Sequence, residues 1–348
     1  MKTKYLLPII LAVITACQQA PATPLSLPIA TEPSPPTAIA ISPPTATNLP
    51  LPTATPVVLP KMRYASFSVY DSAYIAQELG YFADAGVEVE IVGKNFGGPT
   101  AIQAVASGRA EAGLSAYMSI INAVAAGLPI KAAVELQTEL PDSPKEIMLT
   151  RCADGYKTVK SLKGKTIAIN NIKASFHYTW LMALQQNDMA EDSVIFVNLP
   201  FSAQPEALSK GDVQAAGIIE PFATLAEKAY PDKFCRLFTG GDIFGNRQFG
   251  ATFINSIWAR ENPEVAEAFI TAQKRAQVWS NANSAQSKAI MGKALGIENV
   301  NDMPDYKFAA DGSIIAEDVK YWLDFMVSNK HISVDYLTVE DLVWTKPK

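Results

Sequence analysis

Short apolar strands alternate with helices along most of this chain, and that alternation narrows the available folds more than any other feature. Strands and helices follow one another over residues 61–136 and again over 147–238. Parallel strands need a crossover connection, usually a helix, so the pattern is typical of a largely parallel sheet covered by helices. After an apolar strand at 249–258, only helices are expected, at 263–279, 287–295 and 315–327. The sequence therefore predicts an α/β fold.

A weak internal repeat is consistent with two similar lobes. Residues 104–112 and 207–215 each read as a helix end, a glycine turn and a strand. Junctions of this kind are common in α/β proteins, and few of the paired residues are identical. The repeat therefore agrees with two α/β lobes without establishing them.

Residues 1–17 have the layout of an export signal. Lys2 and Lys4 make a basic start, an apolar run covers 5–14, and small residues lead to Cys17. The run is shorter than the roughly 20 residues that a membrane-spanning helix needs. The ending Ile-Thr-Ala-Cys resembles a bacterial lipobox, in which the cysteine is lipidated; the alternative is an ordinary secretory signal cleaved nearby. Both readings place the mature protein outside the cytoplasm.

Residues 18–60 read as a tether. They contain twelve of the chain's 24 prolines, no glycine, and Glu32 as their single charge. A segment with so few apolar side chains cannot offset its ordering entropy, so we expect an extended, polyproline-like linker. It would join a membrane anchor to a folded domain.

Charge and composition exclude several kinds of site. The net charge is −5, and no basic patch with interleaved aromatic residues occurs, so we expect no nucleic-acid partner. His177 and His331 are the only histidines, so no metal site is predicted. Beyond the signal, Cys152 and Cys235 are the only cysteines, and the sequence leaves open a disulfide between them or two buried thiols. No cofactor motif is found.

The stretch 162–180 carries the clearest signs of a binding site. A β-branched run at 166–169 ends at a pair of asparagines, and a helix then begins near Ser175, a residue type that often caps helices. In α/β sheets, small molecules bind at the carboxyl ends of strands, facing helix N-termini. We therefore interpret this stretch as half of a ligand pocket.

Other strand ends supply further candidates for the same pocket. The first lobe would contribute aromatic and neutral polar side chains: Tyr70, Asp71, Ser72, Asn95, Phe96, Ser115 and Tyr117. The second lobe would contribute a similar group: Asn170, Asn171, Ser175, Phe176, His177, Tyr178, Phe201, Glu220 and Phe222. This set suits a flat heteroaromatic ligand, because rings stack on Tyr and Phe while Asn, Ser and Glu bind its polar edge.

Some of these candidates have equally plausible structural roles. His177 fits a surface helix position as well as a cleft, and Tyr178 and Trp180 cannot face the same way two residues apart on a helix. The Gly97–Gly98 pair could cradle an anion or simply make a tight turn. The nearby cations Lys94, Lys173 and Arg247 could be solvated.

Several segments, in order and spacing, resemble the solute-binding proteins of ABC importers, in the branch for nitrate, sulfonates, taurine, thiamine pyrimidine precursors and riboflavin. The likeness covers roughly residues 61–330. It is carried by Ala76-Gln77-Glu78-Leu79-Gly80-Tyr81-Phe82, Gly86-Val87-Glu88-Val89-Glu90, Gly97-Gly98, Ser107-Gly108-Arg109-Ala110-Glu111, Ser161-Leu162-Lys163-Gly164-Lys165 and Glu220-Pro221-Phe222.

The resemblance implies a periplasmic-binding-protein-like (type II) fold, with two α/β lobes closing on a ligand. Lobe I would comprise residues 61–146 and 251–348, and lobe II residues 147–250. The implied function is a monomeric, lipid-anchored binding protein at the cell membrane, which delivers its ligand to the permease and ATPase subunits of an importer. The aromatic candidates favour riboflavin, then a thiamine pyrimidine precursor; an oxoanion such as an alkyl sulfonate or nitrate is the alternative.

Two other functional classes compete with this interpretation. Some relatives of this family make the thiamine pyrimidine as enzymes, using iron and a cysteine-rich run. This chain has only isolated cysteines, so we expect no enzyme. A ligand sensor or an inert surface lipoprotein stays open.

Overall fold

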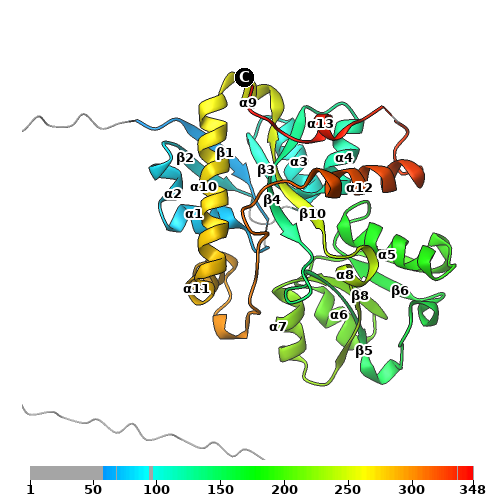
Figure 1. Cartoon of the computed structure of the whole chain (residues 1–348). Helices are drawn as coiled ribbons and strands as arrows, with labels where there is room; N and C mark the ends of the chain where they lie inside the picture. The colour runs from blue at the N-terminus through cyan, green and yellow to red at the C-terminus, as the bar shows by residue number, and fades with distance from the viewer. Residues whose placement is uncertain (1–57, 68, 94–96, 335, 348) are drawn as a thin grey trace, which may run out of the picture. The chain divides into compact units, whose positions relative to one another are not determined.

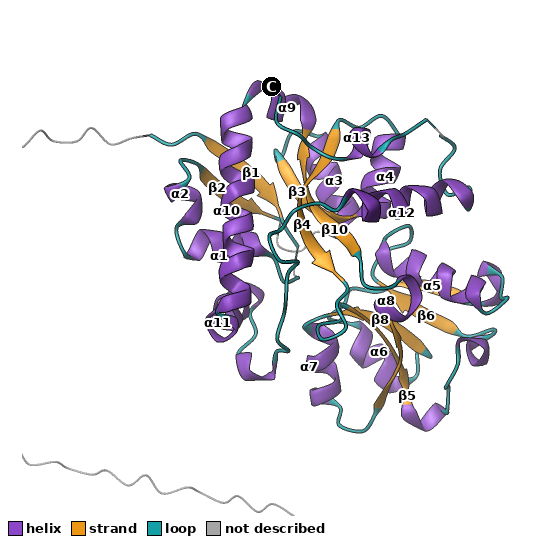
Figure 2. Cartoon of the chain, in the orientation of Figure 1, coloured by secondary structure: helices purple, strands orange, loops and turns teal. Residues whose placement is uncertain are grey.

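Ten strands form two five-stranded mixed sheets (Figures 1 and 2). The computed structural model describes residues 58–67, 69–93, 97–334 and 336–347, which belong to one compact unit, Val57–Lys348. The first sheet has the order β2-β1-β3-β10-β4. Its strands are β1 (Lys61–Ala65), β2 (Glu88–Val92), β3 (Ala112–Ala116), β4 (Ile130–Thr138) and β10 (Gln248–Asn255).

The second sheet repeats this arrangement with the order β7-β6-β8-β5-β9. Its strands are β5 (Glu146–Arg151), β6 (Thr166–Ile169), β7 (Ile195–Asn198), β8 (Ala215–Ile219) and β9 (Phe234–Thr239). In each sheet one strand runs against its neighbours: β10 in the first and β5 in the second. The prediction of largely parallel sheets is confirmed, with these two exceptions.

Helices cover both faces of each sheet. On one face of the first sheet lie α1 (Ser72–Glu78), α2 (Tyr81–Asp84), α10 (Pro263–Ala282) and α11 (Ser284–Leu295); on the other lie α3 (Gly98–Ala106), α4 (Tyr117–Ala125), α12 (Ala316–Ser328) and α13 (Val339–Leu342) (Figure 1). The second sheet has α5 (Ser175–Gln186) on one face and α6 (Gln204–Lys210) and α7 (Phe222–Ala229) on the other.

The apolar alternation of the strands explains this layering. In β5, Ile147 and Leu149 pack on the α6–α7 side, whereas Met148 packs on the α5 side. Successive side chains of a strand point to opposite faces, so a strand covered on both faces reads as a continuous apolar run. The central strands β3, β5 and β8 are accordingly buried along nearly their whole length, whereas the edge strands β2, β7 and β9 are partly exposed.

Two connections, at residues 139–145 and 240–247, run between the sheets, and the second contains α8 (Gly240–Phe244). The carboxylate of Glu139 accepts hydrogen bonds from the backbone N–H groups of Lys145 (3.0 Å) and Glu146 (2.7 Å). Its own backbone N–H donates to the carbonyl of Arg247 at 3.1 Å. One buried residue thus helps to fix both connections, the first through its side chain and the second through its backbone.

One predicted strand ends earlier than expected. The apolar run 249–258 does not stay extended, because α9 (Ser256–Glu261) begins inside it. The side chain of Asn255 accepts hydrogen bonds from the backbone N–H groups of Ile257 and Trp258, which is the capping geometry that starts a helix.

The two sheets follow the predicted lobes closely, although β5 begins one residue before the predicted boundary at 147 and β10 begins three residues before that at 251. The lobe division itself stays a prediction, since residues 57–348 form one compact unit. The sulfur atoms of Cys152, which directly follows β5, and Cys235, which lies in the neighbouring strand β9, form a disulfide with an S–S distance of 2.04 Å.

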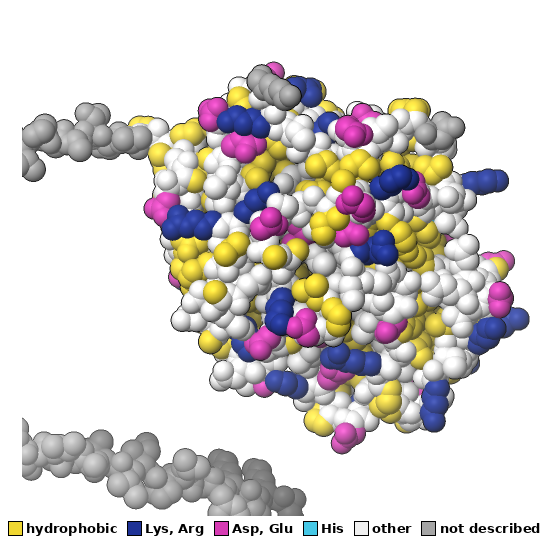
Figure 3. Space-filling model, viewed as in Figure 1, with side chains coloured by type: hydrophobic (Ala, Val, Ile, Leu, Met, Phe, Trp, Pro, Cys, Tyr) yellow, Lys and Arg dark blue, Asp and Glu magenta, His cyan; other side chains and the backbone are white. Residues whose placement is uncertain are grey.

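The described residues show a mixed surface charge and no membrane-spanning helix. Basic and acidic side chains are interspersed over the face in Figure 3. None of the helices in residues 58–347 that the structure describes is long and apolar enough to cross a membrane. The predicted lipidation site Cys17 and the tether at 18–60 lie outside the described residues, apart from the last few tether positions.

Candidate functional site

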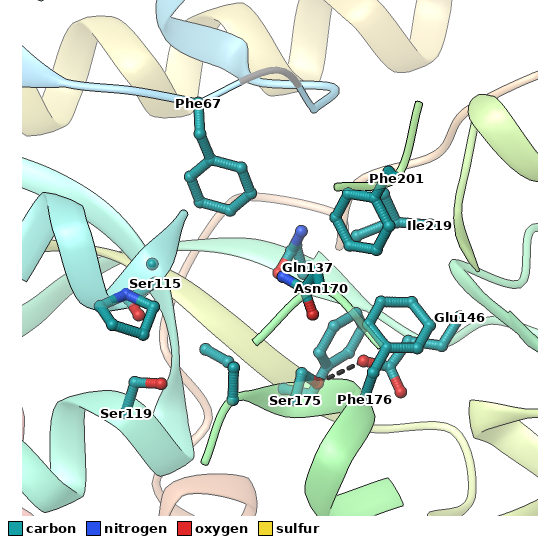
Figure 4. Close-up of a pocket in the computed structure, with 15 residues that line it drawn as sticks. Phe67, Ser115, Ser119, Gln137, Glu146, Asn170, Ser175, Phe176, Phe201 and Ile219 are labelled. Carbon is teal, nitrogen blue, oxygen red and sulfur yellow. Dashed lines mark hydrogen bonds between the residues drawn. The ribbon is translucent and has the colours of Figure 1, made fainter. Parts of the chain in front are cut away.

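Two adjoining hollows lie between the sheets and share Phe67, Asn170 and Phe201. The inner cavity, of about 30 Å³, is lined by Phe67, Gly98, Pro99, Ser115, Ala116, Ser119, Gln137, Glu146, Asn170, Ala174, Ser175, Phe176, Phe201, Ile219 and Phe249 (Figure 4). The outer groove, of about 600 Å³, is lined by Phe67, Gly97, Thr100, Asn170, Asn171, Asn198, Leu199, Pro200, Phe201, Ser202, Phe222 and Leu295. The groove has the size of a small-molecule site.

The first sheet supplies one wall of the inner cavity through the start of α3. A Cβ atom on Gly97 would lie 2.7 Å from the side-chain nitrogen of Asn171, and one on Gly98 would collide with the hydroxyl of Ser115. Both glycines have negative φ or helical geometry, so it is close approach rather than backbone conformation that favours them. The helix start can therefore lie directly against β3 and the opposite wall.

The second sheet supplies the other wall through the end of β6 and the start of α5. Asn170 follows β6 directly, and Phe176 packs on the bare backbone of Gly217 in β8. Phe201 meets the ring of Phe176 edge-on, with centroids 5.3 Å apart. The stretch that the sequence singled out thus contributes the Asn170 amide and the aromatic ring of Phe176 to the cavity.

Ser175 does not cap α5 as the sequence predicts. The N-cap residue is Ala174, which offers no side-chain hydrogen bond, and Ser175 is the first helical residue. Its hydroxyl instead donates a hydrogen bond to the buried carboxyl group of Glu146 (Figure 4).

Glu146 is the one acidic side chain among the described lining residues of the two hollows. It is 0% exposed, and Thr179 also donates a hydrogen bond to it, at 2.6 Å from Oγ1 to Oε2. Burial is the main cause that raises the pKa of Glu146 to about 8, although the two hydroxyls oppose that shift. A carboxyl in this setting holds its proton at neutral pH.

Two further polar atoms face the inner cavity without a hydrogen-bond partner among the described residues. They are the hydroxyl oxygen of Ser115 and the side-chain oxygen of Asn170. Buried polar groups in proteins are nearly always paired, so such atoms mark a place for a ligand.

Cations are scarce at this site. Neither hollow has a Lys or Arg among its described lining residues. Lys173 is exposed, and the Arg247 guanidinium stacks on the ring of Tyr321, 3.8 Å from its centroid. Lys94 lies outside the described residues. No group of three or more His, Cys, Asp or Glu side chains that could hold a metal occurs in the part of the chain that the structure describes.

Seven of the predicted site residues come together around these hollows. Ser115, Asn170, Asn171, Ser175, Phe176, Phe201 and Phe222 all line one or both of them. Asn95 and Phe96, which the sequence places beside the same helix start, lie outside the described residues.

Four predicted site residues lie elsewhere, in the core of the first sheet: Tyr70, Asp71 and Ser72 after β1, and Tyr117 at the start of α4. Tyr70 stacks on Tyr306 with centroids 4.2 Å apart, and its hydroxyl contacts that of Ser287 at 2.6 Å. Asp71 caps α1, Ser72 accepts a hydrogen bond from Gln277, and the Tyr117 hydroxyl donates to Gln248. Each of these polar groups is hydrogen-bonded within the half of the molecule that contains the first sheet, and none of the four residues lines either hollow.

His177, Tyr178 and Glu220 are likewise buried away from the hollows. His177 packs edge-on against Phe196. Tyr178 accepts a hydrogen bond from Asn122 at 3.2 Å, and Trp180 is fully buried too, so neither of this pair reaches the hollows. The Glu220 carboxylate turns back to the backbone and hydroxyl of Thr224 in α7.

Part of the lining is not predicted by the sequence, including Phe67, Ser119, Gln137, Glu146 and Phe249. Glu146 and Phe249 lie at the beginnings of β5 and β10, the two strands that run against their neighbours. A search restricted to carboxyl ends of strands overlooks them. The available signal was a Glu directly before the apolar run Ile147–Leu149.

Solved structures with the same fold include binding proteins. The ligand-binding component of an ABC-type import system from Staphylococcus aureus matches with TM-score 0.67 and 16% identity, over 82% of this chain and 96% of that one. The periplasmic aliphatic sulphonate-binding protein SsuA of Escherichia coli gives 0.65 and 20%, over 82% and 98%. The periplasmic nitrate-binding protein NrtA of Synechocystis gives 0.67 and 13%, over 82% and 86%. The predicted periplasmic-binding-protein-like fold is confirmed.

Relatives found by sequence are also named as binding proteins. Putative binding proteins of Brucella abortus and Brucella melitensis are 29% identical to this chain over 150 residues, which is 42% of this chain and 46% of each relative. The match spans about half of their length. These relatives and the three structures above are named as binding proteins and not as enzymes, in agreement with our prediction, and none of their names mentions riboflavin. The family model described as "NMT1/THI5 like" matches residues 70–287, and the chain therefore belongs to the NMT1/THI5-like family.

Proposed function

We propose that this protein is the solute-binding component of an ABC importer, and that it captures a small, flat heteroaromatic solute. The observation that carries this proposal is the lining of the outer groove. Aromatic rings of Phe67, Phe201 and Phe222 occur there with the amides of Asn170, Asn171 and Asn198. Aromatic walls with a few polar groups are typical of small-molecule sites.

Riboflavin is our first choice of ligand, and a thiamine pyrimidine precursor is the second. Both are planar, and both present N–H and carbonyl or ring-nitrogen groups at one edge. Stacking would supply most of the binding energy, while the amides would set the orientation. The named relatives support a binding role and leave the choice of heterocycle to experiment.

Riboflavin fluorescence gives a direct test of this ligand class. Titration of riboflavin with the purified full-length chain should quench its fluorescence, and Phe201→Ala should weaken binding about tenfold through lost stacking. Phe196→Ala is the matched control, because Phe196 is a half-buried ring of the same sheet that lines neither hollow. Equal affinities of the two variants would argue against the groove as the site.

A second candidate ligand is an oxoanion. The starts of α3 and α5 both reach the inner cavity, and helix N-termini attract anions. Two structures of this fold are named for sulphonate and nitrate binding. Tight binding of methanesulfonate or nitrate without any binding of flavins or pyrimidines would establish this alternative.

We also propose that the mature protein is anchored outside the cytoplasm through a lipid on Cys17. The lipobox-like ending and the proline-rich tether support this anchor. Cys17→Ser should release the protein from membranes into the soluble fraction. Retention of the variant in the membrane fraction would contradict the lipid anchor.

A further inference from the structure

A single buried carboxyl gives the inner cavity its chemical character. Glu146 is the first residue of β5, and its backbone N–H is held by the Glu139 carboxylate at 2.7 Å. Its two oxygens accept the hydroxyls of Ser175 and Thr179, which lie one turn apart on α5. Three hydrogen bonds thus fix where this carboxyl points.

No described cation forms an ion pair with Glu146. The neighbouring Lys145 turns away, and its Nζ donates instead to the hydroxyl of Ser143 at 2.7 Å. A buried carboxyl is costly unless its oxygens are satisfied, and each oxygen can accept more than one hydrogen bond. The two hydroxyls therefore leave accepting capacity on Glu146 for a ligand.

The unpaired atoms of the cavity have the same preference. The Asn170 side-chain oxygen can only accept, and the Ser115 hydroxyl can accept or donate. These accepting oxygens therefore favour a ligand that carries N–H groups. An oxoanion brings acceptors only: it could accept the proton of the neutral Glu146 carboxyl, but it would leave the Asn170 oxygen and the other Glu146 oxygen without a donor.

The two hollows differ in size, so each would hold a different part of the ligand. About 30 Å³ admits roughly two or three groups the size of a water molecule, so only the edge of a ligand fits the inner cavity. The planar body would lie in the outer groove of about 600 Å³. Phe67 and Phe201 lie on either side of the Gln137 and Asn170 amides, where these two parts would meet (Figure 4).

We propose that Glu146 determines specificity: it selects the edge of a nitrogen heterocycle that carries an amino or ring N–H group, and it disfavours oxoanions. A carboxyl pairs with such an edge through two parallel hydrogen bonds, since it can accept from the amino group and donate to the ring nitrogen. This inference rests on the proposed function and names the ligand edge that the site recognises.

A matched pair of probes tests the inference in the wild-type protein. By calorimetry on the full-length chain, 4-amino-2-methylpyrimidine should bind about tenfold more tightly than 2,4-dimethylpyrimidine, in which a methyl group of similar size replaces the amino group and no N–H remains. Methanesulfonate should bind more weakly than the amino probe. Equal binding of the two pyrimidines, or tighter binding of methanesulfonate, would overturn the role of Glu146.

Variants then assign the selectivity to this residue. Glu146→Gln and Glu146→Met should reduce the preference for the amino probe to less than about threefold. Glu135→Gln is the matched control and should keep the preference for the amino probe. Glu135 is an equally buried carboxyl that accepts a hydrogen bond from Thr138 at 2.5 Å and lines neither hollow. Circular dichroism and thermal unfolding check that each variant is folded, and the wild-type comparison holds even if one is not.

The outcomes separate the inference from the function beneath it. If riboflavin binds and Glu146 variants keep the full preference for the amino probe, the inference fails and the proposed function stands. If sulfonates bind while neither flavin nor pyrimidine does, the proposed heteroaromatic ligand fails as well.

Discussion

The loops after β1 and β6 occupy equivalent places but have opposite properties. Each strand is second in its sheet, is flanked by parallel neighbours, and is followed by a helix that begins with a serine, Ser72 or Ser175. After β1, Asp71 accepts hydrogen bonds from three groups of its own half: Tyr64 at 2.9 Å, Ser66 at 2.7 Å and the Ala73 backbone at 2.8 Å.

After β6, the polar groups are not satisfied in this way. Asn170 has an unpaired side-chain oxygen, and the α5 start has no side-chain cap. The hydroxyl of Ser175, the first residue of α5, donates a hydrogen bond to Glu146 on β5. The same topological position therefore gives a closed structural joint in one sheet and an open polar surface in the other. Local pairing, rather than position at a strand end, decides which.

The largest expected effect is loss of stability at the closed joint. Asp71→Ala should lower the free energy of unfolding by about 4 kcal/mol, because it removes three buried hydrogen bonds to a carboxyl group, one of which caps α1. Urea unfolding measures the loss. Asp84→Ala, which removes an exposed ion pair with Arg275, should cost less than about 1 kcal/mol.

This prediction can fail in an informative way. If Asp71→Ala weakens ligand binding while stability is unchanged, then Asp71 belongs to the binding site after all, and the contrast between the two loops is wrong.

The next effect concerns pH and the open surface. Burial raises the pKa of Glu146 from 4.5 to about 8, so the folded state holds this proton more tightly than the unfolded state. Its stabilisation is complete below about pH 4.5 and is lost as pH rises toward 8. The Glu146→Gln variant does not have this pH-dependent loss. The free energy of unfolding of the variant minus that of the wild type should therefore increase by ~3 kcal/mol from pH 5 to pH 8, at about 1.4 kcal/mol per pKa unit.

Other buried acids, Glu135 and Glu139 among them, also change their protonation with pH in the wild-type protein and in the Glu146→Gln variant. Burial also raises the pKa values of Glu135 and Glu139 to about 7. Because both proteins retain these groups, the difference between their unfolding curves reports on Glu146. A constant difference from pH 5 to pH 8 would show that Glu146 does not bind its proton more tightly in the folded state.

The two equivalent serines offer a smaller, direct comparison. Ser175→Ala removes a hydrogen bond to a buried carboxyl and should cost about 1.5 kcal/mol, whereas Ser72 accepts only a long bond of 3.3 Å from Gln277 and its loss should cost about 0.5 kcal/mol. Because the Ser175 hydroxyl lowers the pKa of Glu146, its removal should also move the pH-dependent loss to higher pH. Thermal unfolding at several pH values separates the two variants.

Much of the fold could be predicted from the sequence because it depends on local pattern. Apolar runs separated by helices require covered sheets, and the observed strands fall close to the predicted ones. The site was predictable only where it follows parallel strands, as at Asn170 and Phe176. Glu146 and Phe249 reach it from the beginnings of reversed strands, and strand direction depends on long-range pairing.

The false candidates have a related cause. Composition at a strand end shows which polar groups are present but not whether partners distant in sequence satisfy them. Tyr70 finds Ser287 and Tyr117 finds Gln248, each more than 100 positions away. Such pairs turn a binding-type residue into part of the core.

The smallest effect on stability is expected at Asn170. Its side-chain oxygen makes no hydrogen bond with described residues, so Asn170→Ala should change the free energy of unfolding by less than about 0.5 kcal/mol. Binding, in contrast, should be clearly weakened. The affinity for 4-amino-2-methylpyrimidine should fall about three- to tenfold, because a ligand N–H loses its acceptor. Calorimetry and urea unfolding on one preparation give both numbers. A stable variant with reduced affinity is the reverse of the Asp71→Ala result, and an unstable variant with unchanged affinity would make the β6 loop a structural joint like that after β1.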